Sequence, residues 1–246
     1  MLRTDQSIFE IDTIMFYQPV PSCQIPNLGS FYEELFGVRK EGCFIEIGAY
    51  DGETVSNTSC LADLGWTGIY VEPVKQYAEV CAQRHRRNQV TVVNCAVGDR
   101  PGRSQISVGQ VLSSMANHHI EQFKQLDWSR SFHSNNLQEV EVITPPQLLN
   151  RCFPGGIPSI DLLVVDVEGY ELPVIRAWDF DQCKPQVIIV ELRDLDPQFN
   201  EDIRQEGLDV LRLLKRSGYS VFWRDQTNTI LKASSQSSHT ESVLVF

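Results

Sequence analysis

The clearest structural signal in the sequence is Phe44-Ile45-Glu46-Ile47-Gly48-Ala49-Tyr50-Asp51-Gly52, an apolar run that ends in acids and two glycines. Apolar runs of this length between turn residues are typical of buried parallel strands. A second run, Ile69-Tyr70-Val71, ends in Glu72. A glycine turn after a first strand lets the backbone approach a nucleotide, and an acid after the second strand can bind ribose hydroxyls. Together the two segments predict a site for an adenosine-containing cofactor.

The spacing of glycines and acids distinguishes between cofactors. Dinucleotide sites favour Gly-x-Gly-x-x-Gly, because the second glycine lets a pyrophosphate approach a helix N-terminus. Here the glycines are Gly48 and Gly52, Tyr50 takes the second-glycine position, and Glu46 precedes the turn. Acids near the turn repel a pyrophosphate and suit a ligand with a cationic centre and an ammonium group. This favours S-adenosylmethionine, and an NAD-dependent oxidoreductase on a similar sheet is the competing hypothesis.

Strands that alternate with helices predict an α/β fold, with a mostly parallel sheet and helices on both faces. The predicted strands are 43–49, 68–72, 90–97, 105–108, 140–143, 160–166, 187–192, 219–223 and 229–231. The predicted helices are 31–36, 54–64, one opened by Pro73, 169–178 and one from Leu208 to Gly218.

Three parts of the chain are expected to differ in organisation. Residues 1–40 are expected to form an N-terminal extension that packs on the core, 41–233 the main domain, and 234–246 a C-terminal tail. Residues 109–138 are polar with scattered aromatics, which favours a lid or substrate-binding segment and leaves a disordered surface loop as the alternative.

Unusual polar residues follow several predicted strands, at the edge where ligands of such sheets bind. They are Glu46, Gly48, Glu72, Asn94, Asp166 and Glu191. Their coincidence at one edge is the main argument for an active site.

Composition narrows the range of partners and locations. The net charge of −11 over 246 residues argues against nucleic-acid binding, which relies on clustered Lys and Arg. The basic run Arg84–Arg87 is interpreted as the end of a helix, where cations are favourable, with a site for RNA or an anionic surface as the alternative. Seven cysteines without a Cys-x-x-Cys pair suit a reducing compartment. With no signal-peptide pattern and no apolar stretch long enough to span a membrane, a cytoplasmic location is expected.

Four further motifs follow residues 44–52 along the chain: Ser56-Asn57-Thr58, Gly65-Trp66-Thr67-Gly68-Ile69-Tyr70-Val71-Glu72-Pro73, Asn94-Cys95-Ala96-Val97-Gly98-Asp99 and Asp166-Val167-Glu168-Gly169-Tyr170-Glu171. Together with residues 44–52, these motifs resemble the FkbM family of S-adenosylmethionine-dependent methyltransferases. The resemblance covers residues 40–192 and implies a class I methyltransferase (Rossmann-like) fold, with a seven-stranded sheet whose last strand is antiparallel. It also implies O-methylation of a hydroxyl on a sugar, polyketide or other secondary metabolite.

The resemblance also implies which residues bind S-adenosylmethionine. They are Glu46, Gly48, Ala49, Tyr50, Asp51, Asn57, Thr58, Glu72, Pro73, Asn94, Ala96, Val97 and Asp166. Glu72 would bind the ribose hydroxyls, Asn94 to Val97 would frame the adenine, and Asp166 would face the reacting end. Tyr50 departs from the Gly-x-Gly-x-Gly pattern of methyltransferases in general but is acceptable within this family.

A hydroxyl is a poor nucleophile at neutral pH, so a general base is expected. The catalytic candidates are Asp166, Glu168 and His119, with His118 and His133 as further histidines; the two acids could instead cap the following helix. Asp166, Glu191, Asp194 and Asp196 offer oxygen ligands for Mg²⁺, but acid-rich loops are usually solvated, and no metal is predicted.

The expected function is therefore methyl transfer to a hydroxyl of a small molecule or glycan. A non-catalytic module that binds S-adenosylmethionine or a partner is the alternative, and a homodimer is possible. An RNA methyltransferase is disfavoured by the negative charge.

Overall fold

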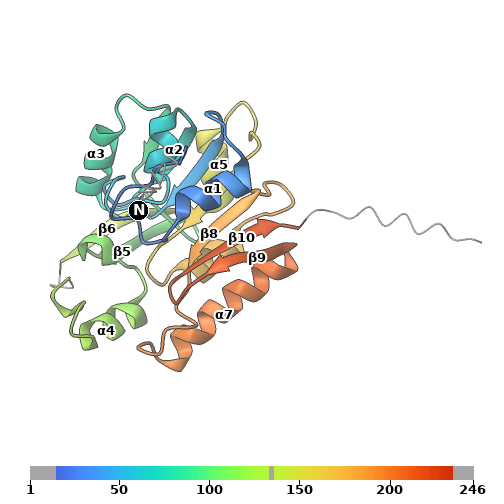
Figure 1. Ribbon diagram of the computed structural model, residues 1–246. Helices are drawn as coiled ribbons and strands as arrows, with labels where there is room; N and C mark the ends of the chain where they lie inside the picture. Colours follow the sequence, from blue (N-terminus) through green and yellow to red (C-terminus); the bar gives the residue numbers. More distant parts are fainter. Residues whose placement is uncertain (1–14, 133–135, 235–246) are drawn as a thin grey trace, which may run out of the picture.

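The computed structural model describes residues 15–132 and 136–234 (Figure 1). Positions 1–14 of the expected extension, His133, and positions 235–246 of the expected tail lie outside the described residues. The helices are α1 (Leu28–Phe36), α2 (Ser59–Leu64), α3 (Lys75–Arg84), α4 (Asn117–Gln125), α5 (Pro145–Cys152), α6 (Glu171–Ala177) and α7 (Glu201–Arg216), with short 3-10 helices η1 (Gln110–Leu112) and η2 (Arg130–Phe132). The strands are β1 (Cys43–Ile47), β2 (Thr67–Val71), β3 (Val90–Val93), β4 (Ala96–Val97), β5 (Gly102–Ser107), β6 (Leu137–Ile143), β7 (Leu162–Val165), β8 (Val187–Glu191), β9 (Tyr219–Arg224) and β10 (Asn228–Ala233).

Seven of these strands form one sheet in the order β3-β2-β1-β7-β8-β10-β9. The five strands β3, β2, β1, β7 and β8 run parallel to one another, whereas β10 is antiparallel to both β8 and β9. The expected mostly parallel sheet of seven strands, the last of them antiparallel, is confirmed. The chain order reverses between β1 and β7, which is the switch point where open sheets of this kind bind ligands.

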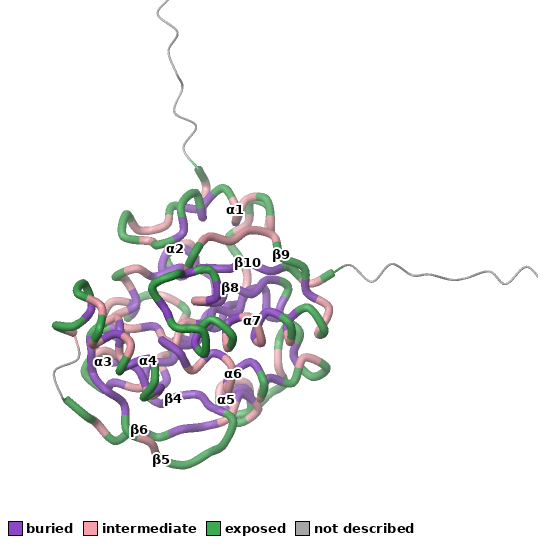
Figure 2. The backbone as a smooth tube through the Cα atoms, turned by 90° about the horizontal axis from the view of Figure 1, so that it is seen from below, coloured by how far each residue is buried: buried purple, intermediate pink, exposed green. Residues whose placement is uncertain are grey.

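The two faces of the sheet follow from the alternation of side chains along each strand. Cys43, Ile45 and Ile47 of β1 join the core cluster beneath α5, α6 and α7. Phe44 faces the other side, where α1, α2 and α3 cover the sheet. The central strands are buried on both sides, which explains why their sequences are continuous apolar runs (Figure 2).

A second sheet of three strands, β4-β6-β5, lies beside the main one. The single strand expected over 90–97 is therefore wrong, because β3 ends at Val93 and β4 pairs with β6 instead. Between them, the Asn94 side chain donates hydrogen bonds to the carbonyls of Glu72 and Pro73, both at 2.9 Å. These bonds hold the chain where it leaves the main sheet.

The segment 109–138 is more regular than expected, since it contains η1, α4, η2 and the start of β6. Ala116, Ile120 and Phe123 are buried at helical spacing, but the polar residues between them obscured the pattern. Other boundaries also move. α2 starts at Ser59 rather than 54, since Val55 has a φ of 56°, α3 starts two residues after Pro73, and α6 starts at Glu171 rather than 169.

Two further helices differ from the sequence-based expectation. α7 begins at Glu201, well before Leu208, because the Asn200 side chain accepts a bond from the backbone N–H of Ile203. α5 was not predicted, although Thr144 and Gln147 form a capping box at its start.

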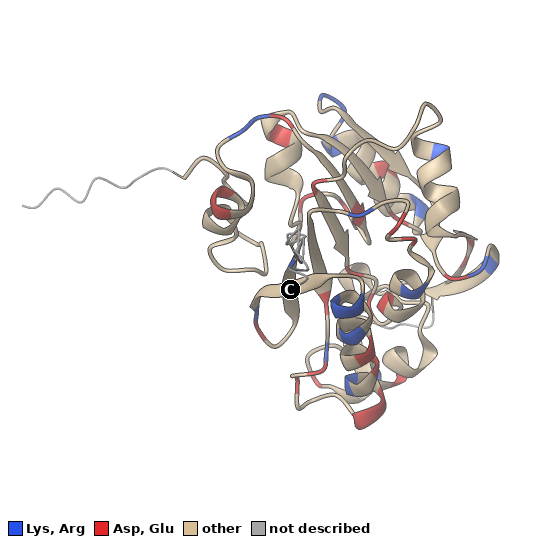
Figure 3. Ribbon diagram, turned by 90° about the vertical axis from the view of Figure 1, so that its right-hand side faces the viewer, with Lys and Arg blue, Asp and Glu red and all other residues tan. Residues whose placement is uncertain are grey.

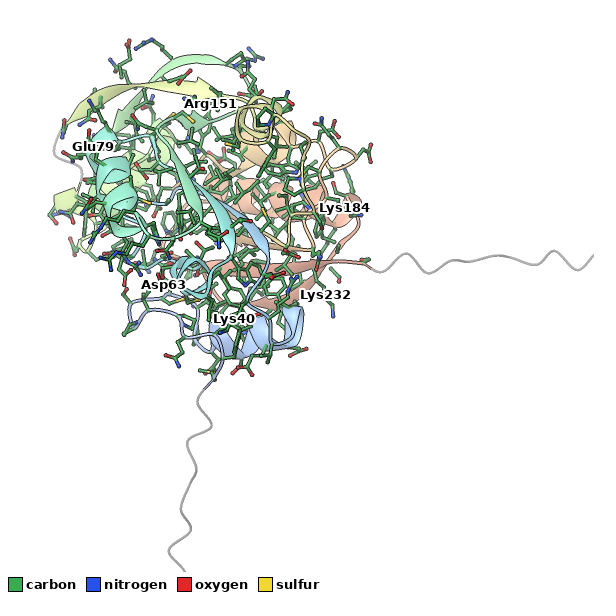
Figure 4. All side chains as sticks on the ribbon, turned by 90° about the horizontal axis from the view of Figure 1, so that it is seen from above. Lys40, Asp63, Glu79, Arg151, Lys184 and Lys232 are labelled. Atoms are coloured by element: carbon green, nitrogen blue, oxygen red, sulfur yellow. The ribbon has the colours of Figure 1, made fainter. Side chains whose placement is uncertain are left out.

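Residues 15–36 pack against the main sheet through aromatic side chains. Tyr17 is fully buried and contacts the rings of Tyr32 and Trp66 edge-on, with centroids 5.7 and 6.4 Å away. Its hydroxyl donates to the carbonyl of Gly37 at 2.8 Å. The charged side chains labelled in Figure 4 lie on the outside of these layers. Within residues 15–132 and 136–234, no helix has the length and apolar character needed to cross a membrane.

Asp161 links the segment before β1 to the start of β7. Its buried carboxylate accepts bonds from the backbone N–H of Cys43 at 2.8 Å and from Arg39 Nη2 at 2.9 Å. Asp161→Ala leaves a buried N–H unpaired and is expected to lower the free energy of unfolding by about 2–3 kcal/mol. Urea denaturation measures this change. The control Asp209→Ala removes an exposed partner of Arg212 and should cost less than about 0.5 kcal/mol; equal costs would contradict the role of Asp161.

Candidate functional site

The turn after β1 lies directly against the turn after β7. Gly48 has a φ of 96°, and a Cβ at this position would overlap the carbonyl oxygen of Asp166. Its N–H and that of Ala49 both donate to the carbonyl of Val71, at 2.9 and 3.1 Å. The turn is therefore anchored to both neighbouring strands, and only glycine combines this backbone conformation with this close approach.

Glu46 lies beneath this turn and is 4% exposed. Its carboxylate accepts hydrogen bonds from the hydroxyls of Thr58 and Ser56. Burial raises the pKa of Glu46 to about 7, although these hydrogen bonds partly offset the effect. A buried acid with a raised pKa favours a cationic ligand, because a nearby positive charge stabilises its ionised form.

Glu72 follows β2 and reaches across to the glycine turn. Its carboxylate accepts bonds from the backbone N–H of Tyr50 at 2.9 Å and from that of Val74 at 2.8 Å. Burial raises the pKa of Glu72 to about 7. Each carboxylate oxygen keeps a second lone pair for a ligand hydroxyl. The Asn94 side chain donates to the carbonyls of Glu72 and Pro73, so it supports this turn.

Asp51 is used locally, as a turn-forming residue. Its carboxylate accepts bonds from the backbone N–H groups of Glu53 and Thr54 and from the Thr54 hydroxyl. Neither Asp51 nor Thr58 lines the cavities described below. Both residues therefore support neighbouring residues that do line the cavities.

Three connected hollows run along this edge of the sheet. The first has a volume of about 510 Å³ and extends from the glycine turn and Glu72 to an apolar end formed by Ala96, Val97 and Ile106. The second, of about 400 Å³, is lined by Glu46 and Asn57 among others. The third, of about 790 Å³, lies beyond them. We call the three together the trough.

Shared lining residues show how the hollows connect. The first and second have in common Gly48, Tyr50, Val111, Asp166 and Glu168. The second and third share Gln24, Val111 and Glu168. Asp166 and Glu168 therefore stand at the centre of the trough.

Three acids converge at this centre around one arginine. Asp166, Glu168 and Glu191 each place a carboxylate oxygen within 4.8 Å of the other two. Arg193 Nη2 lies 2.8 Å from Glu191 and 3.2 Å from Glu168. Burial, with repulsion from Glu191, raises the pKa of both Asp166 and Glu168 well above the usual range, while Arg193 opposes the shift.

The turn that carries Asp166 and Glu168 is held by Glu171. Its carboxylate accepts bonds from the backbone N–H of Val167 at 2.9 Å and from that of Gly169 at 3.0 Å. Glu168 has a φ of 52°, in the left-handed region, and its carbonyl accepts a bond from the Ser114 hydroxyl. Strained backbone of this kind is frequent at functional sites, since surrounding contacts must hold it.

The acids considered for Mg²⁺ from the sequence do not all meet. Asp194 pairs with Arg224 Nη2 at 2.6 Å, and Asp196 accepts a bond from the backbone N–H of Gln198. Glu168 joins Asp166 and Glu191 in their place, and the guanidinium of Arg193 supplies positive charge beside them. Nothing in the sequence pattern pointed to Arg193.

His119 lies outside the trough. It lines a separate hollow between α4 and α7 and packs under Gly169. Burial, with the nearby charges of His118 and Arg193, lowers the pKa of His119 to about 3. Its catalytic role remains a prediction that this position does not favour.

Four residues that line the trough were not singled out from the sequence. Gln110, Ser113 and Met115 belong to the segment 109–138, which was expected to form a lid or substrate-binding segment, and they line the first hollow; Gln24 lines the second and third. The basic run is not a free patch: Arg84 pairs with Glu53 and Asp63, and His85 is buried. On the face seen in Figure 3, Lys and Arg are interspersed with Asp and Glu.

Residues 46–221 match the family model of the methyltransferase FkbM domain. A comparison with curated protein sequences gives no match. Among solved structures, an O-methyltransferase from Bacillus cereus in complex with SAH is 15% identical, with a TM-score of 0.48, covering 86% of this chain and 82% of that chain. The O-methyltransferase TomG from Streptomyces achromogenes, involved in tomaymycin synthesis and in complex with SAM, is 13% identical, with a TM-score of 0.45, covering 78% of this chain and 73% of that chain.

Gly48→Ala tests the contact between the two turns. The added methyl group would overlap the Asp166 carbonyl and oppose the positive φ, so we expect a loss of about 2–4 kcal/mol in the free energy of unfolding. Chemical denaturation followed by circular dichroism measures it. Gly155→Ala, where a Cβ meets nothing within 4 Å, is the control and should change stability by no more than about 0.5 kcal/mol. A Gly48 variant as stable as this control would contradict the steric argument.

Proposed function

The chain belongs to the FkbM methyltransferase family, and we propose that it transfers the methyl group of S-adenosylmethionine to a hydroxyl oxygen of a small, uncharged polyhydroxylated acceptor. The observation that carries the proposal is the continuity of the trough. The first hollow is lined by the glycine turn and by Glu72, an acid suited to an adenosine ligand, and also by Asp166 and Glu168. Glu168 also lines the third hollow, so the two hollows adjoin at this acid. Cofactor, reacting centre and acceptor can therefore occupy adjacent parts of one cavity.

The residues of the first two hollows match the chemistry of S-adenosylmethionine. The apolar end at Ala96, Val97 and Ile106 suits a flat adenine, and Glu72 lies where two ribose hydroxyls could donate to it. Glu46, in the second hollow, suits the ammonium group of the methionine part. When bound, S-adenosylmethionine supplies an electrophilic methyl group on a sulfonium centre.

The chain contributes alignment and proton transfer. Holding the acceptor hydroxyl in line with the methyl group supplies much of the acceleration of a displacement reaction. Asp166 lies at the junction of the hollows, and its raised pKa makes its ionised form a stronger base toward a hydroxyl proton. Glu168, oriented by Arg193, is the second candidate because it lines all three hollows.

The third hollow supports an acceptor with many hydroxyl groups. Its walls combine the aromatic rings of Trp128 and Phe132 with the polar side chains of Gln24 and Asn228. Rings can stack on an apolar sugar face, while amides can pair with hydroxyls. Glu168, Glu191 and Asp225 outnumber the one arginine of the hollow, Arg193, so the local charge disfavours phosphates and carboxylates.

The non-catalytic module is the competing hypothesis within this family. It predicts binding of S-adenosylmethionine without methyl transfer to any hydroxylated acceptor. The negative charge of the chain continues to argue against a nucleic-acid acceptor. A homodimer and a cytoplasmic location remain predictions.

Cofactor affinity should rise with pH. Below about pH 7 the free protein holds a proton on Glu46, whose pKa is about 7, and a cationic ligand favours the ionised form of this acid, so binding in this range releases protons. We expect the Kd of S-adenosylmethionine to fall between about pH 6 and pH 8 and then level off. Calorimetry in buffers of different ionisation enthalpy measures both the affinity and the protons released. Glu46→Gln should weaken this dependence, whereas S-adenosylhomocysteine, which lacks the sulfonium charge but keeps the ammonium group, should retain most of it. A Kd that rises with pH would contradict the assignment.

Asp166→Asn should lower kcat by about 10²–10⁴-fold, because it removes the proposed base while keeping the shape of the side chain. Transfer of labelled methyl groups to neutral glycosides, with uronic acids and sugar phosphates of the same sugars for comparison, measures the activity. Asp127→Asn, at an exposed position paired with Arg130, is the control. Full kcat in the Asp166 variant would exclude it as the base. Binding of S-adenosylmethionine by the wild type with transfer to none of these acceptors would favour the non-catalytic module.

A further inference from the structure

A second group of convergent donor atoms lies outside the trough, where α4 meets α7. His118 and His119 are consecutive residues of α4, and Glu206 lies on α7. The Nε2 atoms of His118 and His119 are 2.9 and 3.8 Å from the same oxygen, Oε2 of Glu206. One donor atom from each residue lies within 4.8 Å of the other two. The arrangement gives two imidazole nitrogens and one carboxylate oxygen around a common point.

His119 is the unusual member of this group. The residue is only 4% exposed, yet its side chain makes no hydrogen bond within residues 15–132 and 136–234, and its Nδ1 is buried without a partner. The ring borders a narrow hollow that Glu206 and Gly207 also line. A buried polar ring without hydrogen bonds is costly in free energy, so a ligand at Nε2, the nitrogen that lies 3.8 Å from Glu206 Oε2, would stabilise the ring.

We propose that His118, His119 and Glu206 bind one zinc ion, with water as the remaining ligand. Two histidines and a glutamate are a frequent zinc ligand set. Zinc takes nitrogen and oxygen ligands at roughly 2.0–2.2 Å, so two donors of one ion lie at most about 4.4 Å apart, and small rotations of the side chains bring the three donors within reach. The ion would take no part in the methyl transfer itself.

The charges around the site are compatible with a cation. Glu171 and Glu191 line the same hollow as His119 and Glu206. Arg193 lines it too, but its guanidinium is paired with Glu168 and Glu191. The acids therefore outnumber the one arginine.

A metal ion here would connect α4 to α7. Residues on both sides of α4 line the third hollow: Val111 and Leu112 before it, and Trp128 and Phe132 after it. α7 packs on the core through Val210, Leu211 and Leu214. The ion would thus fix one wall of the proposed acceptor hollow to the body of the protein.

Titration of the tag-free, chelator-treated full chain with zinc tests the proposal, with a chromophoric chelator as competitor. We expect one equivalent to bind, and Glu206→Gln and His118→Gln each to weaken binding at least ten-fold. Both side chains are partly exposed, at 37% and 47%, so the variants should fold, which circular dichroism checks. Glu121→Gln, at an exposed position on α4, is the matched control and should bind zinc like the wild type. Zinc should also raise the Tm of the wild type but not of Glu206→Gln.

Two further measurements distinguish this site from other groups of metal-binding side chains in the chain. Cobalt(II) in place of zinc should show the absorption of nitrogen and oxygen ligation, without a thiolate charge-transfer band from a cysteine. Asp166→Asn should bind zinc as the wild type does, because the acids of the trough are not ligands. Failure of the wild type to bind one equivalent, or unchanged affinity in both Glu206→Gln and His118→Gln, would overturn the proposal.

Discussion

The site depends on a steric constraint at the middle of the sheet. The turn after β1 touches the turn after β7, and the contact is possible because Gly48 has no side chain to meet the Asp166 carbonyl. β1 and β7 are neighbours at the switch point of the sheet. The contact therefore sets how closely the glycine turn approaches the acids after β7. Both Gly48 and Asp166 line the first and the second hollow, so the cavities on either side of the contact depend on it.

The same edge of the sheet concentrates negative charge that is only partly balanced. Glu46, Glu168 and Glu191 are buried and Asp166 is partly buried, and one arginine, Arg193, pairs with two of these acids. Burial of carboxylates without enough positive charge raises their pKa values and costs free energy. A cationic ligand relieves this cost, whereas an anionic one increases it. The charge distribution of the free protein therefore favours the binding of a positively charged cofactor.

Several residues that were predicted to bind the cofactor hold neighbouring groups of the site in place. Asp51 closes the glycine turn through bonds to the backbone of Glu53 and Thr54. Thr58 donates to Glu46, and Asn94 anchors the carbonyls that follow β2. Each fixes a group that does line the trough, and such supporting contacts are needed to hold a site in a productive geometry.

Much of the architecture was readable from local patterns. Apolar runs ended by acids and glycines located the central strands, and the motifs at 44–52 and 166–171 identified the family and the edge that carries the site, because burial on both faces and tight turns leave strong marks in the sequence. The end of β3 just before Asn94 was not visible in the sequence, because it depends on hydrogen bonds to residues about twenty positions earlier. The same holds for Arg193 between Glu168 and Glu191, for Gln24 and Val111 in the lining of one hollow, and for His119 turned toward Glu206. These contacts depend on how helices and turns far apart in the chain pack together, and the direction of a side chain in such packing is set by three-dimensional neighbours that no local pattern encodes.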